Sequence, residues 1–140
     1  MVTVRTVTTV LLVDGDQIER QRWVKKINVL CPHYVVLQAQ TGKEGISICR
    51  TQQVDCVVSE LTLPDMSGLQ LLAKLVSRAY KPDFAVVILS NIDLPSANRM
   101  VKNNGAQAYL IKSQITSDDF IHTIRKAIAK VSPLKEGEWT

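Results

Sequence analysis

The hydrophobic residues of this chain gather in five short runs, separated by longer amphipathic segments. The runs are four or five residues long, mostly apolar and rich in β-branched side chains, at residues 10–13, 34–37, 54–58, 85–89 and 108–111. Runs that are apolar on both faces are typical of parallel strands covered by helices on both sides of a sheet. The pattern therefore predicts five buried strands.

The segments between these runs have helical periodicity. A capping-box-like sequence, Thr116-Ser117-Asp118-Asp119, precedes the clearest of them. The apolar stripes are Ile18, Val24, Ile27 and Cys31, then Leu69, Leu72, Leu75 and Val76, then Phe120, Ile124, Ala127, Ile128 and Val131. Alternation of strand and helix predicts an α/β fold, with a doubly wound five-stranded parallel sheet in the order 2-1-3-4-5. We expect residues 1–131 to form this domain and 132–140 to form a tail or linker.

Composition narrows the class of protein. The chain has 140 residues, of which 46% are hydrophobic and 21% charged, as in an ordinary globular domain. Three widely spaced cysteines favour reduced thiols and a cytoplasmic protein. No stretch approaches the roughly 18 apolar residues of a membrane span, so we expect no membrane contact. The net charge of +4 is mild, and we interpret the basic residues (Arg20, Arg22, Lys25 and Lys26, then Arg125, Lys126 and Lys130) as solvated helix faces, without nucleic-acid binding.

Polar residues follow the predicted strands. Asp14 and Asp16 come after the first strand, Glu60 after the third, Ser90 ends the fourth and Lys112 follows the fifth. Because the carboxyl ends of parallel strands meet at one edge of the sheet, these groups should converge there. The chain has no glycine-rich phosphate loop and no Gly-x-Ser-x-Gly motif, so we expect neither an enzyme nor a bound cofactor.

Four motifs, in order, resemble the receiver domains of bacterial two-component response regulators, from Val10 to about Val131. They are Leu12-Val13-Asp14, residues 55–68 with the ending Leu-Pro-Asp-Met-Ser-Gly, Ile88-Leu89-Ser90, and residues 104–112. The resemblance implies that Glu60 stands at the phosphoacceptor position, that Asp14 and Asp16 form an acidic site, and that Ser90, Tyr109 and Lys112 act as the switch. Residues 112–116 resemble receivers found in multidomain sensor kinases.

Two residues depart from the family pattern. The family has an aspartate four residues before the loop proline, where this chain has Glu60, and a second acid after the first strand, where it has Gly15. The longer glutamate displaces its carboxylate by about 1.5 Å, which is severe for in-line phosphoryl transfer. A magnesium site formed by Asp14, Asp16 and Glu60 should be weak or absent, and Asp16 could equally be a helix N-cap.

These departures predict a degenerate receiver that works without phosphorylation, in which Glu60 reaches Lys112 directly. The alternative is a functional phosphoacceptor that is phosphorylated by a histidine kinase. We expect a protein partner, either a histidine kinase or an output domain, at the face made by the fourth helix, fifth strand and fifth helix; a homodimer could use the same face. If the two departures are what prevents phosphorylation, Glu60→Asp together with Gly15→Asp should restore it.

Overall fold

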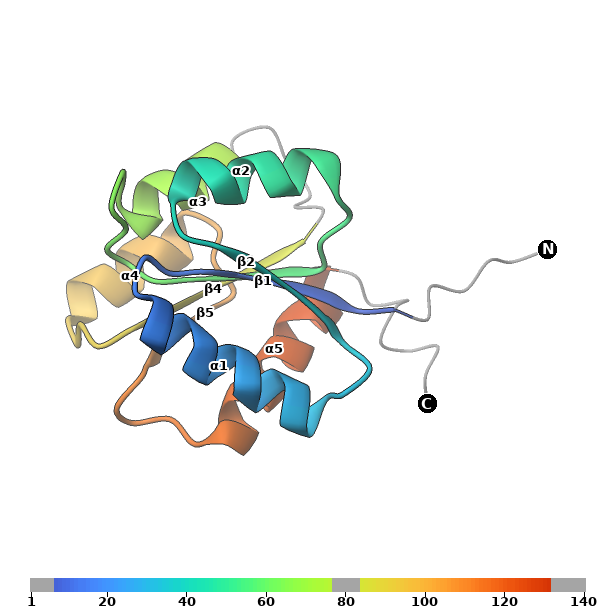
Figure 1. Ribbon diagram of the computed structural model, residues 1–140. Helices are drawn as coiled ribbons and strands as arrows, with labels where there is room; N and C mark the ends of the chain where they lie inside the picture. The colour runs from blue at the N-terminus through green and yellow to red at the C-terminus, as the bar shows by residue number, and fades with distance from the viewer. Residues whose placement is uncertain (1–6, 77–83, 132–140) are drawn as a thin grey trace.

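The structure is a computed structural model that describes residues 7–76 and 84–131. The expected tail at 132–140 lies outside the described residues. The strands are β1 (Thr9–Val13), β2 (Val35–Ala39), β3 (Cys56–Ser59), β4 (Ala85–Ser90) and β5 (Ala108–Ile111). They form one parallel sheet in the order β2-β1-β3-β4-β5 (Figure 1). The predicted fold class and strand order are therefore confirmed.

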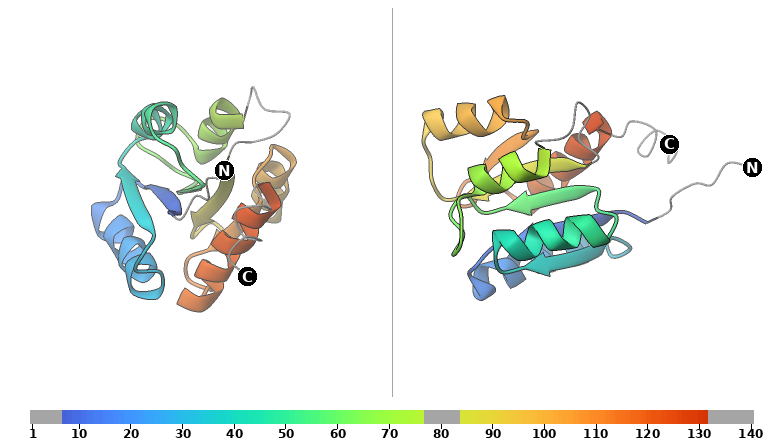
Figure 2. Two further views of the ribbon diagram at one scale, coloured as in Figure 1. Left: turned by 90° about the vertical axis from the view of Figure 1, so that its right-hand side faces the viewer. Right: turned by 90° about the horizontal axis from the view of Figure 1, so that it is seen from above.

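Helices cover both faces of the sheet (Figure 2). On one face, α1 (Gln17–Leu30) and α5 (Ser117–Val131) pack over side chains such as Leu12 and Val58. On the other, α2 (Gly42–Thr51), α3 (Gly68–Val76) and α4 (Pro95–Asn103) pack over Leu11, Val57 and their neighbours. Each strand thus sends alternate side chains into one of two separate cores, which explains why the runs are apolar at nearly every position. No described helix is long and apolar enough to cross a membrane.

The core on the α1 and α5 face is centred on two aromatic rings. Trp23 and Phe120 meet edge to face with ring centroids 4.9 Å apart, and both are almost fully buried. The predicted stripe of α1 was wrong at Ile18, which is 82% exposed. Ile18 lies six residues before Val24, about 120° away around the helix, so the buried face passes through Trp23 instead.

The interpretation of the basic residues of α1 as a solvated face was wrong at Arg20. It is only 5% exposed, and its guanidinium has polar partners that offset the loss of water. Its Nη1 donates to the carbonyl oxygen of Asp14 at 2.6 Å, and its Nε donates to Oε1 of Gln38 at 2.9 Å. Arg20 therefore ties α1 to the end of β1, where the polar residues gather.

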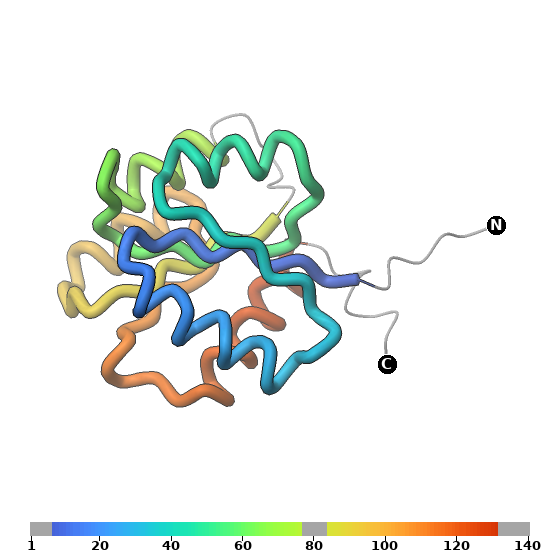
Figure 3. Tube along the Cα trace, in the orientation of Figure 1, coloured from blue at the N-terminus to red at the C-terminus, as the bar shows by residue number. Residues whose placement is uncertain are grey.

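The carboxyl ends of the strands lie at a single edge of the sheet. Figure 3 shows the chain turning at this edge from β1 into α1, from β3 towards α3 and from β4 towards α4. At the opposite end of the strands, Asp55 is buried and its Oδ2 accepts from the amide of Thr9 at 2.8 Å. Cys31, Cys49 and Cys56 are all free thiols.

The aromatic pair gives a test of the packing. Phe120→Ala removes a fully buried ring and its contact with Trp23, so we expect it to lower the free energy of unfolding by about 3–5 kcal/mol. Ile18→Ala, an apolar truncation at an exposed helical site, should change it by about 0.5 kcal/mol or less. Urea denaturation followed by circular dichroism measures both. Equal losses in the two variants would contradict this packing.

Candidate functional site

A cavity of about 490 Å³ opens at the carboxyl edge of the sheet. Its lining comes from the segments that follow β1, β3, β4 and β5 and from the first turn of α1: Asp14, Gly15, Asp16, Glu19, Glu60, Thr62, Leu63, Pro64, Asn91 and Lys112. The structure thus brings together the acids and the lysine that the sequence placed at the strand ends, although Ser90 is not part of this lining.

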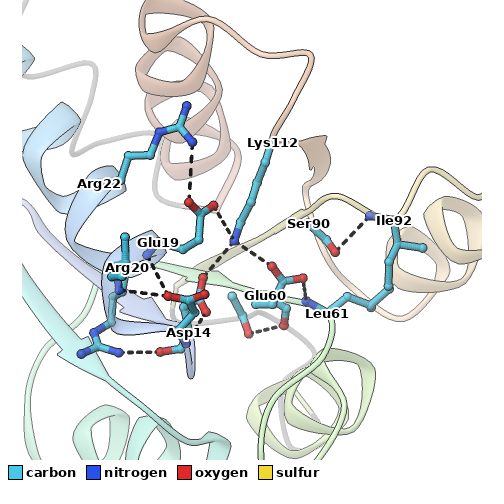
Figure 4. A network of polar contacts seen from close by, with 12 residues as sticks. Asp14, Glu19, Arg20, Arg22, Glu60, Leu61, Ser90, Ile92 and Lys112 are labelled. Atoms are coloured by element: carbon cyan, nitrogen blue, oxygen red, sulfur yellow. Dashed lines mark hydrogen bonds and ion pairs between the residues drawn. The ribbon is translucent and has the colours of Figure 1, made fainter.

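Lys112 is at the centre of the site, and its ammonium group meets three carboxylates (Figure 4). Its Nζ lies 2.8 Å from Oε2 of Glu60, 3.0 Å from Oδ2 of Asp14 and 3.4 Å from Oε1 of Glu19. Burial by itself lowers the pKa of Lys112, but the hydrogen bonds to Glu60 and Asp14 outweigh it and hold the pKa above its ordinary value. The ammonium is therefore charged at neutral pH.

The second carboxylate oxygens of Asp14 and Glu60 also accept hydrogen bonds, in both cases from backbone amides. Oδ1 of Asp14 accepts from the backbone amide of Asp16 at 2.9 Å. Oε1 of Glu60 accepts from the backbone amide of Leu61, also at 2.9 Å. With Lys112 on the other oxygen of each, all four carboxylate oxygens of Asp14 and Glu60 have a partner within the protein.

Asp16 caps the first turn of α1. Its Oδ1 accepts from the amides of Ile18 at 3.0 Å and Glu19 at 3.1 Å, which satisfies two of the free donors at the helix start. Of the two roles that the sequence left open, the structure places Asp16 in the capping role.

Gly15 is covered by the loop that follows β3. A Cβ atom on Gly15 would lie 2.7 Å from Cγ and 2.8 Å from Cδ of Pro64. Such separations are well inside van der Waals contact, and a proline ring has little freedom to withdraw. A side chain at this position, where the family has its second acid, would therefore require the loop that carries Pro64 to shift.

The same loop is fastened to the start of α2. Met66 packs over Gly42, where a Cβ atom would lie 2.5 Å from its sulfur. Asp65 accepts from the amides of Gly42 at 2.9 Å and Lys43 at 3.0 Å, and the bonds from Lys43 and Gly42 lower the pKa of Asp65. The wall of the cavity is thus held by backbone and ring contacts on both sides.

Glu19 is a site residue that the sequence reasoning missed. It occupies the third position of α1 after the Asp16 cap, where an acid usually completes a capping box by accepting from the amide of the cap residue. Here Asp14 has already taken the amide of Asp16, so Glu19 turns to Lys112 and, at 3.6 Å, to Arg22. The sequence does show an acid three residues after the Asp16 cap, but an acid at that position predicts ordinary helix capping.

Ser90 and Tyr109 meet the loop after β4. Ser90 Oγ accepts from the amide of Ile92 at 3.3 Å, and the hydroxyl of Tyr109 donates to the carbonyl oxygen of Ile92 at 2.6 Å. Burial raises the pKa of Tyr109, and the charge of Glu60 raises it further, which keeps the phenol protonated as a donor. Tyr109 is only 8% exposed, so its ring is turned inward.

The residues present do not fit a divalent cation. Magnesium requires several oxygen ligands at about 2.0–2.1 Å in octahedral geometry. The oxygens of Asp14 and Glu60 are bonded to Lys112 and backbone amides, Asp16 caps α1, and Gly15 has no carboxylate. Across residues 7–76 and 84–131, no group of three or more His, Cys, Asp or Glu side chains is arranged to hold a metal.

Comparison with known proteins places this geometry in a family. The family model "Response regulator receiver domain" matches residues 10–125. The nitrate/nitrite response regulator protein NarL of Escherichia coli (strain K12) is 27% identical over 129 residues, which cover 91% of this chain and 58% of NarL. Protein PilH of Pseudomonas aeruginosa is 27% identical over 94 residues, covering 67% of this chain and 77% of PilH. This chain thus spans little more than half of NarL.

Solved structures agree at the level of the fold. The signal receiver domain of an HD domain-containing protein from Pseudomonas fluorescens Pf-5 has a TM-score of 0.80 at 24% identity, covering 90% of this chain and 98% of that one. A CheY-like receiver domain protein from Methanospirillum hungatei JF-1 has a TM-score of 0.79 at 20% identity, covering 96% and 100%. The family model matches most of the chain, and the solved receiver domains share its fold. The chain belongs to the response regulator receiver domain family of two-component signalling.

Proposed function

We propose that this receiver domain works without phosphorylation, as a module that regulates a partner or an attached domain by protein contact. The observation that carries the proposal is the saturation of Asp14 and Glu60, whose four carboxylate oxygens are all bonded within the protein. A phosphoacceptor needs one oxygen free for in-line attack and a cation beside it to neutralise the developing charge. Neither condition is met by these contacts.

The Glu60–Lys112 ion pair supports a single fixed state. In the proposed function, the pair holds the loops after β3 and β5 together permanently, as a phosphoryl group would do only transiently. Tyr109 is already turned inward and bonded to the β4–α4 loop. We infer that Ser90, Tyr109 and Lys112 transmit this one state to the surface rather than switch between two.

The partner is proposed to bind at the α4–β5–α5 face. A groove of about 260 Å³ on this face lies beside Tyr109 and is lined by Lys102, Lys126 and Lys130, with no carboxylate in its lining. A two-fold homodimer centred on the groove would bring these lysines towards their own copies, which is unfavourable. An acidic protein surface fits the face better than a second copy of this chain.

The partner could be part of the same polypeptide. NarL, of which this chain covers 58%, is named a response regulator, and the transcriptional regulatory protein GlrR, 28% identical over 107 residues, is covered over only 23% of its length. We propose that residues 132–140 link the receiver domain to a further domain of either the output or the kinase type.

Phosphorylation itself can be tested directly. We expect no phosphate adduct when the protein is incubated with acetyl phosphate and Mg²⁺, because neither Glu60 nor Asp14 has an unbonded oxygen. Intact-mass spectrometry measures the adduct, with a receiver that has an aspartate phosphoacceptor as the positive control. A substantial adduct that disappears in Glu60→Gln would favour the alternative function, a working phosphoacceptor.

The structure changes the expected result of restoring the two family acids, Glu60→Asp and Gly15→Asp, to rescue phosphorylation. Gly15→Asp requires the loop that carries Pro64 to shift, so Glu60→Asp with Gly15→Asp should lose stability and be phosphorylated only in part. Adding Pro64→Ala, which removes Cγ and Cδ of the ring, should give measurable phosphorylation in the triple variant. The same mass assay measures the adduct on the wild type, the double variant and the triple variant. If the double variant were phosphorylated as fully as the triple, Pro64 would not be the obstacle.

The charge of the groove predicts the oligomeric state. The wild-type domain should sediment as a monomer at low ionic strength, where repulsion between Lys102, Lys126 and Lys130 of two copies is least screened. Raising the salt concentration should also leave it monomeric. A dimer in sedimentation velocity that is abolished by Lys126→Glu with Lys130→Glu would identify the face as a homodimer interface.

A further inference from the structure

The cavity has a cation at its centre that belongs to the protein itself. An ammonium group has three N–H donors, and three carboxylates surround Nζ of Lys112 within 3.4 Å. They come from three separate segments: the end of β1 (Asp14), the first turn of α1 (Glu19) and the end of β3 (Glu60). The number of donors therefore matches the number of acidic side chains.

Glu19 is what distinguishes this arrangement from a simple pair at the end of the sheet. Because the Asp16 amide donates to Asp14, Glu19 is not engaged in a capping box. One of its oxygens meets Lys112, and the other meets Arg22. In Figure 4 its carboxylate lies above the ammonium, while those of Asp14 and Glu60 lie below it.

Positive side chains of the protein already contact each acid of the cluster. Lys112 reaches Asp14, Glu19 and Glu60, and Arg22 also reaches Glu19. The buried Arg20 donates to the backbone carbonyl of Asp14 and adds positive charge beside the cluster. None of the three carboxylates therefore depends on an added ion for a positive partner.

We propose that the ammonium of Lys112, fixed in place by Glu19, is the built-in cation of this pocket and takes the place of a divalent metal ion. This inference deepens the proposed phosphorylation-independent function and rests on the same bonded carboxylates, those of Asp14 and Glu60. It makes the state of the domain independent of the concentration of Mg²⁺. Glu19 then acts as a positioning residue, since it touches the lysine and no reacting group.

Manganese(II) is the probe, and its binding is followed by electron paramagnetic resonance and by thermal unfolding. Wild type should show no saturable Mn²⁺ binding and no change in melting temperature. Lys112→Met leaves three carboxylates without their cation and should gain saturable binding, with a melting temperature that Mn²⁺ raises. Lys112→Met with Glu19→Gln should lose that binding again. Lys25→Met, at an exposed lysine of α1 that has no part in the cavity or in the groove, is the matched control and should behave as wild type.

Saturable binding of Mn²⁺ to wild type would overturn the inference, and so would a folded Lys112→Met variant that binds no Mn²⁺. Should that variant fail to fold, the wild-type protein still decides the question. The ¹⁵N signal of the Lys112 ammonium should be visible, protected from exchange and unchanged by Mg²⁺, and Glu19→Gln should accelerate its exchange. A signal that Mg²⁺ abolishes would contradict the proposal.

These results separate the two proposals. A phosphate adduct on a wild-type protein that binds no Mn²⁺ would overturn the proposed function and leave the built-in cation standing. Binding of Mn²⁺ to wild type without any phosphate adduct would overturn the built-in cation and leave the proposed function standing.

Discussion

A single buried positive charge organises the functional edge of this domain. Lys112 holds acids from the ends of two strands and from one helix, so the loops that carry them share one electrostatic anchor. Buried ion pairs gain little over apolar packing, but removal of one partner from such a pair costs about 3–5 kcal/mol because the other charges are left unpaired. The cluster therefore specifies a conformation more than it adds stability.

Close packing reinforces this anchor from the opposite wall of the cavity. Pro64 and Met66 occupy the space over Gly15 and Gly42 in which other side chains would place a Cβ atom, while Asp65 accepts from the start of α2. The loop after β3 is thus fitted to two glycines as well as to an ion pair. The conformation of this loop therefore depends on both the charge cluster and the packing over the two glycines.

The sequence predicted the strands and their order because β1, β3 and β4 are buried on both faces, which leaves a strong local signal in residues such as Val10–Val13. It also predicted that Asp14, Glu60 and Lys112 would meet, since strand ends converge in any sheet of this class. Arg20, Ile18 and Glu19 were misjudged or missed. Their surroundings depend on the rotation of α1 and on whether the Asp16 amide is already bonded, and neither is encoded in local periodicity.

The position of β5 at the margin of the sheet has a consequence for solubility. Among the described strands it pairs only with β4, and an uncovered strand margin is a template for pairing with other chains. Three exposed lysines, Lys102, Lys126 and Lys130, stand beside it. Their mutual repulsion discourages two copies from joining strand to strand at this margin.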